Sequence, residues 1–293
     1  MHTCQSLAAS ACSPGPGTRP RSQAPVRAAS EATGIEQSHG PCAETTEYRL
    51  TSSGANHVFL AKRASVPPDC SRELIAVAAS KDGGRTFGEF IDTAALLPTS
   101  DFITDVAVAS DADTGVVIAW LDHQSRNDRR GNIGRVFVTR STDTGKTFQE
   151  PIRVDDPGKT AVHDSFSGLT MVRQGSRDLL LSGTDKRRGP EEDIRDLWCA
   201  RSSDGGASFS SETLVGPPAD ASTPKYLPLV AANARGEVLA VWKQPKQQDR
   251  TEWSFHGAVS VDGGRSFRSL GPLLADSEDV ATLKLRQHPR GGQ

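Results

Sequence analysis

Ser80-Lys81-Asp82-Gly83-Gly84-Arg85-Thr86-Phe87 is the first of four copies of one octapeptide. The others cover residues 141–148, 202–209 and 260–267, and all follow the form Ser-x-Asp-x-Gly-x-Ser/Thr-Phe. Their first serines are 61, 61 and 58 residues apart. A period this regular is typical of a repeat architecture, in which each repeat is one structural unit that packs on its neighbours.

Each position of the octapeptide suits a tight turn between two strands. The Asp side chain accepts hydrogen bonds from the backbone N–H groups that follow it, and the Gly supplies a positive φ. The hydroxyl group of the Ser or Thr ties the turn further, and the Phe returns to the core. We therefore expect a structural role for the four aspartates, Asp82, Asp143, Asp204 and Asp262.

Short apolar stretches surround each octapeptide, and the second unit shows them best. Residues 102–109 alternate between apolar and polar, 111–115 form a turn, and 116–120 are apolar. A third stretch, 135–140, leads into the octapeptide, and 148–154 follow it. This pattern predicts a four-stranded antiparallel meander of about 60 residues. The other units align with it, at residues 47–97, 98–157, 158–218 and 219–275, with the start of a further unit at 276–293.

The octapeptides resemble Asp boxes, also called BNR repeats, and residues 47–275 are similar to the sialidase superfamily. The resemblance implies an all-β fold, a β-propeller built from four-stranded antiparallel blades. That superfamily has six blades, whereas four full blades are visible here. Asp boxes also occur in non-catalytic propellers such as sortilin-type receptors and photosystem assembly factors, and in some glucanases. The resemblance therefore predicts the fold more firmly than the function.

Composition agrees with a turn-rich, all-β protein. The chain has 293 residues, 35% of them hydrophobic, with 27 glycines and 18 prolines. The net charge of −2 is too small to attract the chain to nucleic acid or to a membrane surface, so neither is an expected partner. No apolar run approaches the roughly 18 residues of a transmembrane helix.

The first 46 residues differ from the rest because they contain almost no large apolar side chains, which predicts a disordered segment. Within it, residues 8–12 resemble the lipobox end of a bacterial lipoprotein signal. This resemblance implies a periplasmic or extracellular protein that is lipid-anchored through Cys12. The alternative is a tail of Ala and Ser without such a function.

The five cysteines do not have the spacing of a zinc site. Cys199 lies in an apolar strand and is expected in the core. Cys42 and Cys70 are a candidate disulfide if the protein is exported. His163 and Asp164 are adjacent but lack a third ligand nearby, and no phosphate-binding glycine loop is present, so we expect no metal and no cofactor.

The meander topology places the octapeptides and the first turn of each unit at the same end of the strands. Long polar loops between the second and third strands, at 122–134, 184–193 and 243–250, lie at the other end, which we expect to carry function. Basic residues there would suit an anionic ligand such as a carboxylate, the alternative being an ordinary solvated surface. The candidate ligand-binding residues are Arg126, Arg130, Arg187, Lys225 and Lys243.

The crossings between units add candidates that precede or begin the innermost strands, namely Asp101, Asp105, His163, Asp164, Lys225 and Tyr226. The sialidase resemblance implies three arginines on a substrate carboxylate, a Tyr nucleophile assisted by a Glu, and an Asp acid/base. The Arg-Ile-Pro motif of that family is absent, and residues 49–51 do not match it. Tyr226, beside Lys225, is the candidate nucleophile, or else an aromatic residue packed at a crossing. Asp101, Asp105 and Asp164 are candidate acids, and no Glu is assigned.

These features predict a sialidase-like propeller that binds a glycan or another partner through its loop-rich face. The first alternative is a divergent exo-α-sialidase, a glycoside hydrolase that cleaves terminal sialic acids. The second is a non-catalytic scaffold for assembly or interaction.

Overall fold

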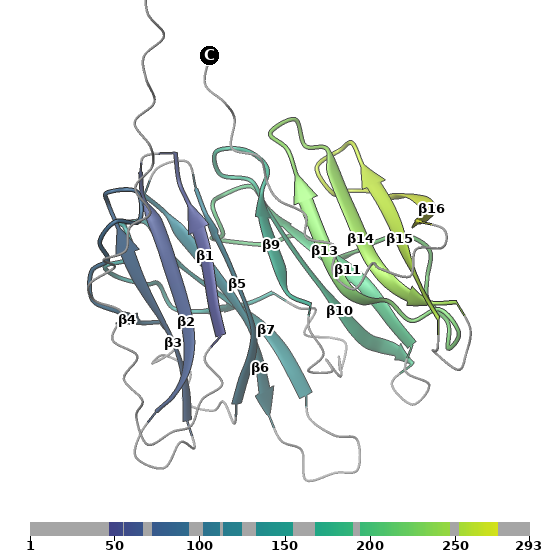
Figure 1. The fold of residues 1–293 in the computed structure, drawn as a ribbon, viewed down its shortest axis with the longest axis horizontal. Coiled ribbons are helices and arrows are strands. Elements are labelled where there is room, and N and C mark those ends of the chain that lie inside the picture. Colours follow the sequence, from purple (N-terminus) through teal and green to yellow (C-terminus); the bar gives the residue numbers. More distant parts are fainter. Residues whose placement is uncertain are drawn as a thin grey trace, which may run out of the picture. The chain divides into compact units, whose positions relative to one another are not determined.

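The structure, a computed structural model, describes residues 47–54, 56–66, 72–93, 102–111, 114–124, 133–154, 168–189, 194–246 and 252–274. These residues form four antiparallel sheets, each of four strands (Figure 1). None of them lies in a helix, and therefore none lies in a helix able to cross a membrane. The all-β prediction, with repeated four-stranded blades, is confirmed.

Each sheet is a meander, in which strands that follow one another in the chain pair side by side. The first sheet contains β1 (Glu47–Ser52), β2 (Val58–Val66), β3 (Arg72–Ser80) and β4 (Ile91–Asp92). The second contains β5 (Phe102–Ser110), β6 (Val116–Gln124), β7 (Ile133–Ser141) and β8 (Ile152–Arg153).

The second half of the chain repeats this order. The third sheet contains β9 (Thr170–Arg173), β10 (Leu179–Gly189), β11 (Ile194–Ser202) and β12 (Thr213–Leu214). The fourth contains β13 (Tyr226–Ala232), β14 (Val238–Pro245), β15 (Trp253–Ser260) and β16 (Arg268–Leu274). The first strands of successive sheets contact each other, β1 with β5, β5 with β9, and β9 with β13, so they are the innermost strands.

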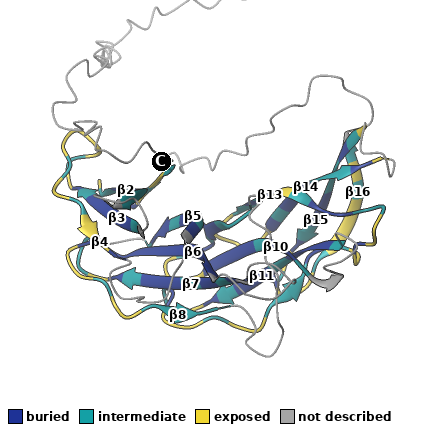
Figure 2. Ribbon diagram, turned by 90° about the horizontal axis from the view of Figure 1, so that it is seen from below, coloured by how far each residue is buried: buried dark blue, intermediate teal, exposed yellow. Residues whose placement is uncertain are grey.

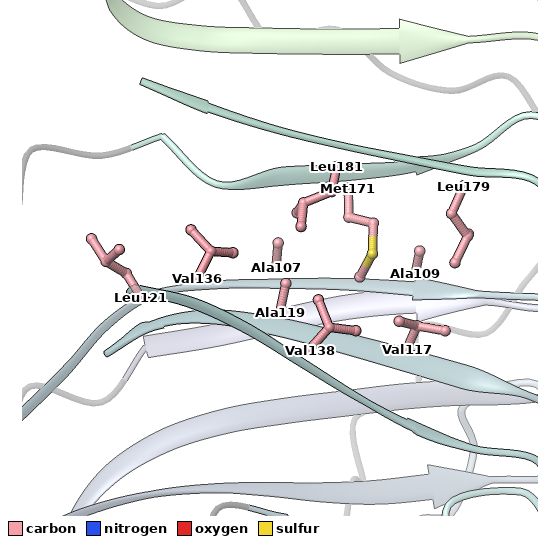
Figure 3. Close-up of a cluster of buried hydrophobic side chains, with 10 residues drawn as sticks. All are labelled: Ala107, Ala109, Val117, Ala119, Leu121, Val136, Val138, Met171, Leu179 and Leu181. Carbon is pink, nitrogen blue, oxygen red and sulfur yellow. The ribbon is translucent and has the colours of Figure 1, made fainter. Parts of the chain in front are cut away.

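Three hydrophobic clusters lie between successive sheets and join the four sheets in series. The middle cluster, between the second and third sheets, contains Leu121, Val138, Met171 and Leu181 (Figure 3). Middle strands such as β6 are buried on both faces because a sheet packs on each side, which explains the continuous apolar run at its start (Figure 2). Exposed residues lie along the outer strands β4 and β16 (Figure 2), and also along β1, the first strand of the first sheet.

The four octapeptides form the same turn between the third and fourth strands of their sheets. In the first, the Ser80 hydroxyl donates to Asp82 Oδ1 at 2.7 Å, and Thr86 donates to the same carboxylate through its backbone N–H (2.9 Å) and its hydroxyl (2.7 Å). The Gly83 N–H donates to the carbonyl oxygen of Asn56 in the turn between β1 and β2, at 2.8 Å. The octapeptide turns therefore lie at the same end of the strands as the first turn of each sheet.

The last residue of the octapeptide links each sheet to the one before it. Phe148 packs against the cluster between the first and second sheets, and Phe209 packs against the next cluster. Phe267 packs in the same way between the third and fourth sheets. The repeat therefore supplies both a turn and part of each boundary between sheets.

Candidate functional site

The second strands of the sheets extend further toward the loop-rich end than the sequence predicts. Asp122 and His123 belong to β6, not to a loop, and pair with Arg135 and Gly134 of β7. Both side chains are buried, and His123 Nε2 lies 2.8 Å from the Thr104 hydroxyl oxygen. Likewise, β10 continues to Gly189 and β14 to Pro245. The prediction of loops there was wrong because polar side chains at these strand ends are buried and partnered across the sheet.

Two candidate ligand-binding residues, Arg126 and Arg130, fall outside the part of the chain that the structure describes, as do the candidate acids Asp101 and Asp164 and the crossing residue His163. Arg187 lies in β10, and its side chain is also outside that part. Cys12, Cys42 and Cys70 fall outside it as well, so the lipid anchor and the disulfide stay predictions. Cys199 is buried in the cluster between the third and fourth sheets, and burial raises the pKa of its thiol to about 12.

Lys225 is 1% exposed, so its ammonium group lies inside the protein and not on the surface where a ligand would meet it. Its Nζ donates to the carbonyl oxygen of Val215 at 2.6 Å and lies 5.0 Å from the centre of the Trp242 ring. Both contacts stabilise a buried cation. This placement indicates that Lys225 holds the third and fourth sheets together.

Tyr226 is half-buried at the start of β13, in a row in which two aromatic rings lie between two cations. The Arg195 guanidinium lies 5.0 Å from the centre of its ring, and the Trp253 ring lies 5.6 Å away in an edge-on arrangement. Lys243 Nζ is 4.1 Å from the centre of the Trp253 ring. The row fixes the Tyr226 ring, as the packing interpretation of this residue expects.

Asp105 lies on the innermost strand β5 in a β-bulge, where β5 and β6 lose register between Thr104 and Ala107. Its φ is +47°, in the left-handed region that non-glycine residues rarely adopt, although Asp tolerates it better than most. Bulges re-aim side chains and recur beside functional sites. Because of the bulge, the Asp105 carboxyl group departs from the regular alternation of side chains between the two faces of β5.

The environment of Asp105 changes its acidity. Burial, followed by the negative charge of Glu47, raises its pKa to about 6. A hydrogen bond from the Gly168 N–H and the positive charges of Arg49 and Arg63 oppose the increase. A carboxyl group with this pKa changes protonation near neutral pH, so it can both donate and accept a proton.

Charged residues of β1 and β2 act on this carboxyl group, and a network of ion pairs extends from them to Glu73 of β3. Glu47 forms ion pairs with Arg49 and with Arg63, the latter at 3.4 Å. Arg63 Nη1 also donates to Glu73 Oε1 at 2.5 Å and to the carbonyl oxygen of Ile103 in β5 at 3.1 Å. The Ile103 N–H in turn donates to Glu73 Oε2 at 2.6 Å. The ion pairs therefore connect β1, β2 and β3 to the strand that carries Asp105.

A crevice between the second and third sheets is lined by Asp105 and Gly168, with Thr184 and Asp185 of β10. We call Glu47, Arg49, Arg63, Asp105 and Gly168 the inner-strand site. Sequence reasoning selected Asp105 but missed the other four as a group. Lys62 and Arg63 follow the apolar run 58–61, and Arg63 was the available signal, since a charged side chain within a largely buried strand requires a partner. Among the described residues, no three His, Cys, Asp or Glu side chains converge as metal ligands.

No family model and no curated protein matches this sequence. Solved structures do match. A Penicillium chrysogenum α-L-arabinanase complexed with arabinobiose is 12% identical, with a TM-score of 0.54, over 77% of this chain and 66% of that one. A Dyadobacter fermentans protein of unknown function is 18% identical, with a TM-score of 0.53, over 75% and 66% of the two chains. A Hadza microbial sialidase, Hz136, is 18% identical, with a TM-score of 0.52, over 77% and 46%.

These similarities show the fold, which is that of the β-propellers to which such arabinanases and sialidases belong. The protein is therefore of the propeller class. It spans less than two thirds of the length of these structures. A ring of six blades and membership of the sialidase superfamily both stay predictions.

Proposed function

We propose that this protein binds a glycan at the loop-rich end of its sheets, on the inner-strand site. The observation that supports this most is Asp105, a half-buried carboxyl group held in a strained bulge with its pKa raised to about 6. Strained backbone and perturbed carboxyl groups are typical of binding and catalytic sites. The propeller fold shared with an arabinanase and a sialidase makes a glycan the first ligand to test.

The charges of the site suit the hydroxyl groups of a sugar. Carboxylates and guanidinium groups form strong, directional hydrogen bonds with such groups. Arg49 and Arg63 are both already ion-paired with carboxylates of this chain. They therefore suit an uncharged sugar better than one that brings a carboxylate of its own.

Calorimetric titration with two probes, arabinobiose and 3′-sialyllactose, tests the proposal. We expect the wild-type protein to bind at least one of them, and Asp105→Asn to weaken that binding by at least about tenfold, equivalent to one charged hydrogen bond. Asp92→Asn, on the exposed outer strand β4, is the matched control and should bind as wild type does. Binding of neither probe, or equal binding by Asp105→Asn, would overturn the proposal and favour an interaction scaffold.

A second candidate function, glycoside hydrolysis, is favoured by the raised pKa of Asp105, because a general acid must hold its proton near the working pH. In this function Asp105 protonates the leaving-group oxygen. A chromogenic arabinofuranoside or a fluorogenic sialoside would then be turned over, and Asp105→Asn would abolish the reaction. Loss of sialoside cleavage in Tyr226→Phe would identify the exo-α-sialidase mechanism, and its persistence would exclude Tyr226 as nucleophile.

Export of the protein to the periplasm or the cell exterior is consistent with a glycan ligand and is part of the same proposal. It is supported by the lipobox-like sequence that ends at Cys12. Metabolic labelling with a palmitate analogue in a bacterial host tests the anchor. Labelling that is lost in Cys12→Ser is expected, and unlabelled protein would contradict it.

A further inference from the structure

The bulge that carries Asp105 has a counterpart in the fourth sheet. In β5, Asp105 and Val106 together oppose Trp120 of β6, and in β13, Leu227 and Pro228 oppose Trp242 of β14 in the same way. The φ angles agree as well, +47° at Asp105 and +48° at Leu227. Leu227 is therefore the structural equivalent of Asp105 on another innermost strand, with an apolar side chain in place of a carboxyl group.

Leu227 is an unfavourable residue for this position. A left-handed backbone brings Cβ close to the carbonyl oxygen and is tolerated by Gly, Asn and Asp far better than by Leu. The side chain is also 51% exposed, so its burial offsets little of this strain. A strained residue that presents an apolar side chain to solvent indicates a role outside folding.

Leu227 also lies next to the inner-strand site. Gly168 donates its N–H to the Asp105 carboxyl group. The same glycine packs against the β13 bulge, since a methyl group at Gly168 would lie 3.2 Å from Cδ and Cγ of Pro228. One residue thus separates the polar bulge of β5 from the apolar bulge of β13.

Tyr226 gives Leu227 a rigid neighbour. Its ring is held between the Arg195 guanidinium and the edge-on Trp253 ring. Such packing keeps an apolar surface in place before a ligand arrives, which lowers the entropy lost on binding. The two residues together present aromatic and aliphatic surface at the β13 bulge, which Gly168 links to the Asp105 carboxyl group.

We propose that Leu227 and Tyr226 form an apolar subsite next to Asp105, which takes an apolar group carried by the bound sugar. This inference rests on the proposed glycan binding and narrows it to sugars with an apolar substituent. The hydroxyl groups of the sugar meet the inner-strand site, and the substituent contacts Leu227. Such a division between a few polar groups and an apolar wall is the usual arrangement of small-molecule sites.

The test compares two glycosides of one sugar, methyl and 4-methylumbelliferyl, using whichever of arabinofuranose and sialic acid the protein binds. Leu227→Asn keeps a residue suited to the positive φ and removes the apolar surface. We expect it to weaken binding of the methylumbelliferyl glycoside about five- to tenfold and that of the methyl glycoside less than about twofold. Leu227→Met keeps an apolar side chain and should retain the wild-type preference for the methylumbelliferyl glycoside. Leu270 is an exposed leucine on the outer strand β16, and Leu270→Ala should leave both affinities unchanged.

The outcomes separate this inference from the proposed function. If the wild-type protein binds neither sugar, glycan binding fails and the subsite fails with it. If wild type binds and Asp105→Asn does not, but Leu227→Asn affects both glycosides equally or neither, only the apolar subsite is overturned. If the midpoint of thermal unfolding of Leu227→Asn lies within about 2 °C of wild type, any loss of binding is local. If the midpoint is lower, Leu227→Gly takes its place in the binding test, because Gly also tolerates the positive φ.

Discussion

Thr144 in the second octapeptide occupies the position that glycine fills in the other three. Its φ is +64°, and those of Gly83, Gly205 and Gly263 are +75°, +72° and +74°. A β-branched residue is strained in this region. We expect Thr144→Gly to raise the free energy of unfolding by about 0.5–1 kcal/mol, because the relief of strain exceeds the added flexibility of the unfolded chain. Urea denaturation measures the change.

Gly83→Ala provides the reciprocal control. A Cβ at Gly83 would contact no atom within 4 Å, so the substitution tests the backbone conformation alone. It should lower the free energy of unfolding by about 1 kcal/mol. If Thr144→Gly destabilises the protein while Gly83→Ala has no effect, this turn position does not have a positive φ.

Asp105 should make the stability of the protein depend on pH in a direction opposite to that of the octapeptide aspartates. The folded-state pKa of Asp105 is about 6, above its ordinary value of 3.8, so its contribution is fully favourable below pH 3.8 and is lost as the pH rises through 6. Asp105→Asn should therefore be more stable than wild type at pH 7, by on the order of 1–2 kcal/mol. Thermal unfolding from pH 4 to 8 checks this, and equal stability at pH 7 would contradict it.

The octapeptide aspartates should stabilise the folded protein until the solution becomes strongly acidic, because their pKa values lie below the ordinary value of 3.8. Hydrogen bonds from the backbone N–H of Thr147 and from the Ser141 and Thr147 hydroxyls lower the pKa of Asp143 to about 2, against the effect of desolvation. Asp204 has a pKa of about 2 as well, because hydrogen bonds from Ser208 and Ser202 outweigh its desolvation. Their stabilising contribution is present above pH 3.8 and is lost as the pH falls through 2.

Among the elements, β5 is hydrogen-bonded to the first sheet through the side chains of Arg63 and Glu73. These side chains are 11% and 15% exposed, and they bond both to each other and to the backbone of Ile103. Arg63→Met leaves Glu73 and the Ile103 carbonyl short of a partner, so we expect a loss of about 2–4 kcal/mol. Chemical denaturation measures it, and a loss below about 0.5 kcal/mol would show that the pair behaves as a surface ion pair.

The strand pattern was predictable where side chains are apolar and unpredictable where polar side chains are buried. The apolar stretch 116–120 identified the first half of β6, and the octapeptide identified the turn after β7. The end of β6, at Asp122 and His123, reads as a loop because its burial depends on partners that the local sequence does not show. The bulge at Asp105 is also invisible in the sequence, since it lies within a pattern that suits a regular strand, whereas Pro228 in the β13 bulge is a residue that strands carry at edges and bulges.

Across the whole molecule, the repeat and the candidate site occupy opposite ends of the strands. The meander fixes this separation, so the sequence alone could predict which end to examine. The composition of the site could not be predicted in the same way. Its members come from three sheets, with Glu47, Asp105 and Gly168 roughly 60 residues apart, and only the packing between sheets brings them together.

Hydrogen–deuterium exchange of the wild-type protein, with and without saturating arabinobiose or 3′-sialyllactose, tests the central claim most directly. We predict slower exchange in peptides that contain residues 47–50, 102–107 and 226–229, and unchanged exchange in the four octapeptides. Protection confined to residues 80–87, 141–148, 202–209 or 260–267, or no protection with either glycan, would contradict the account.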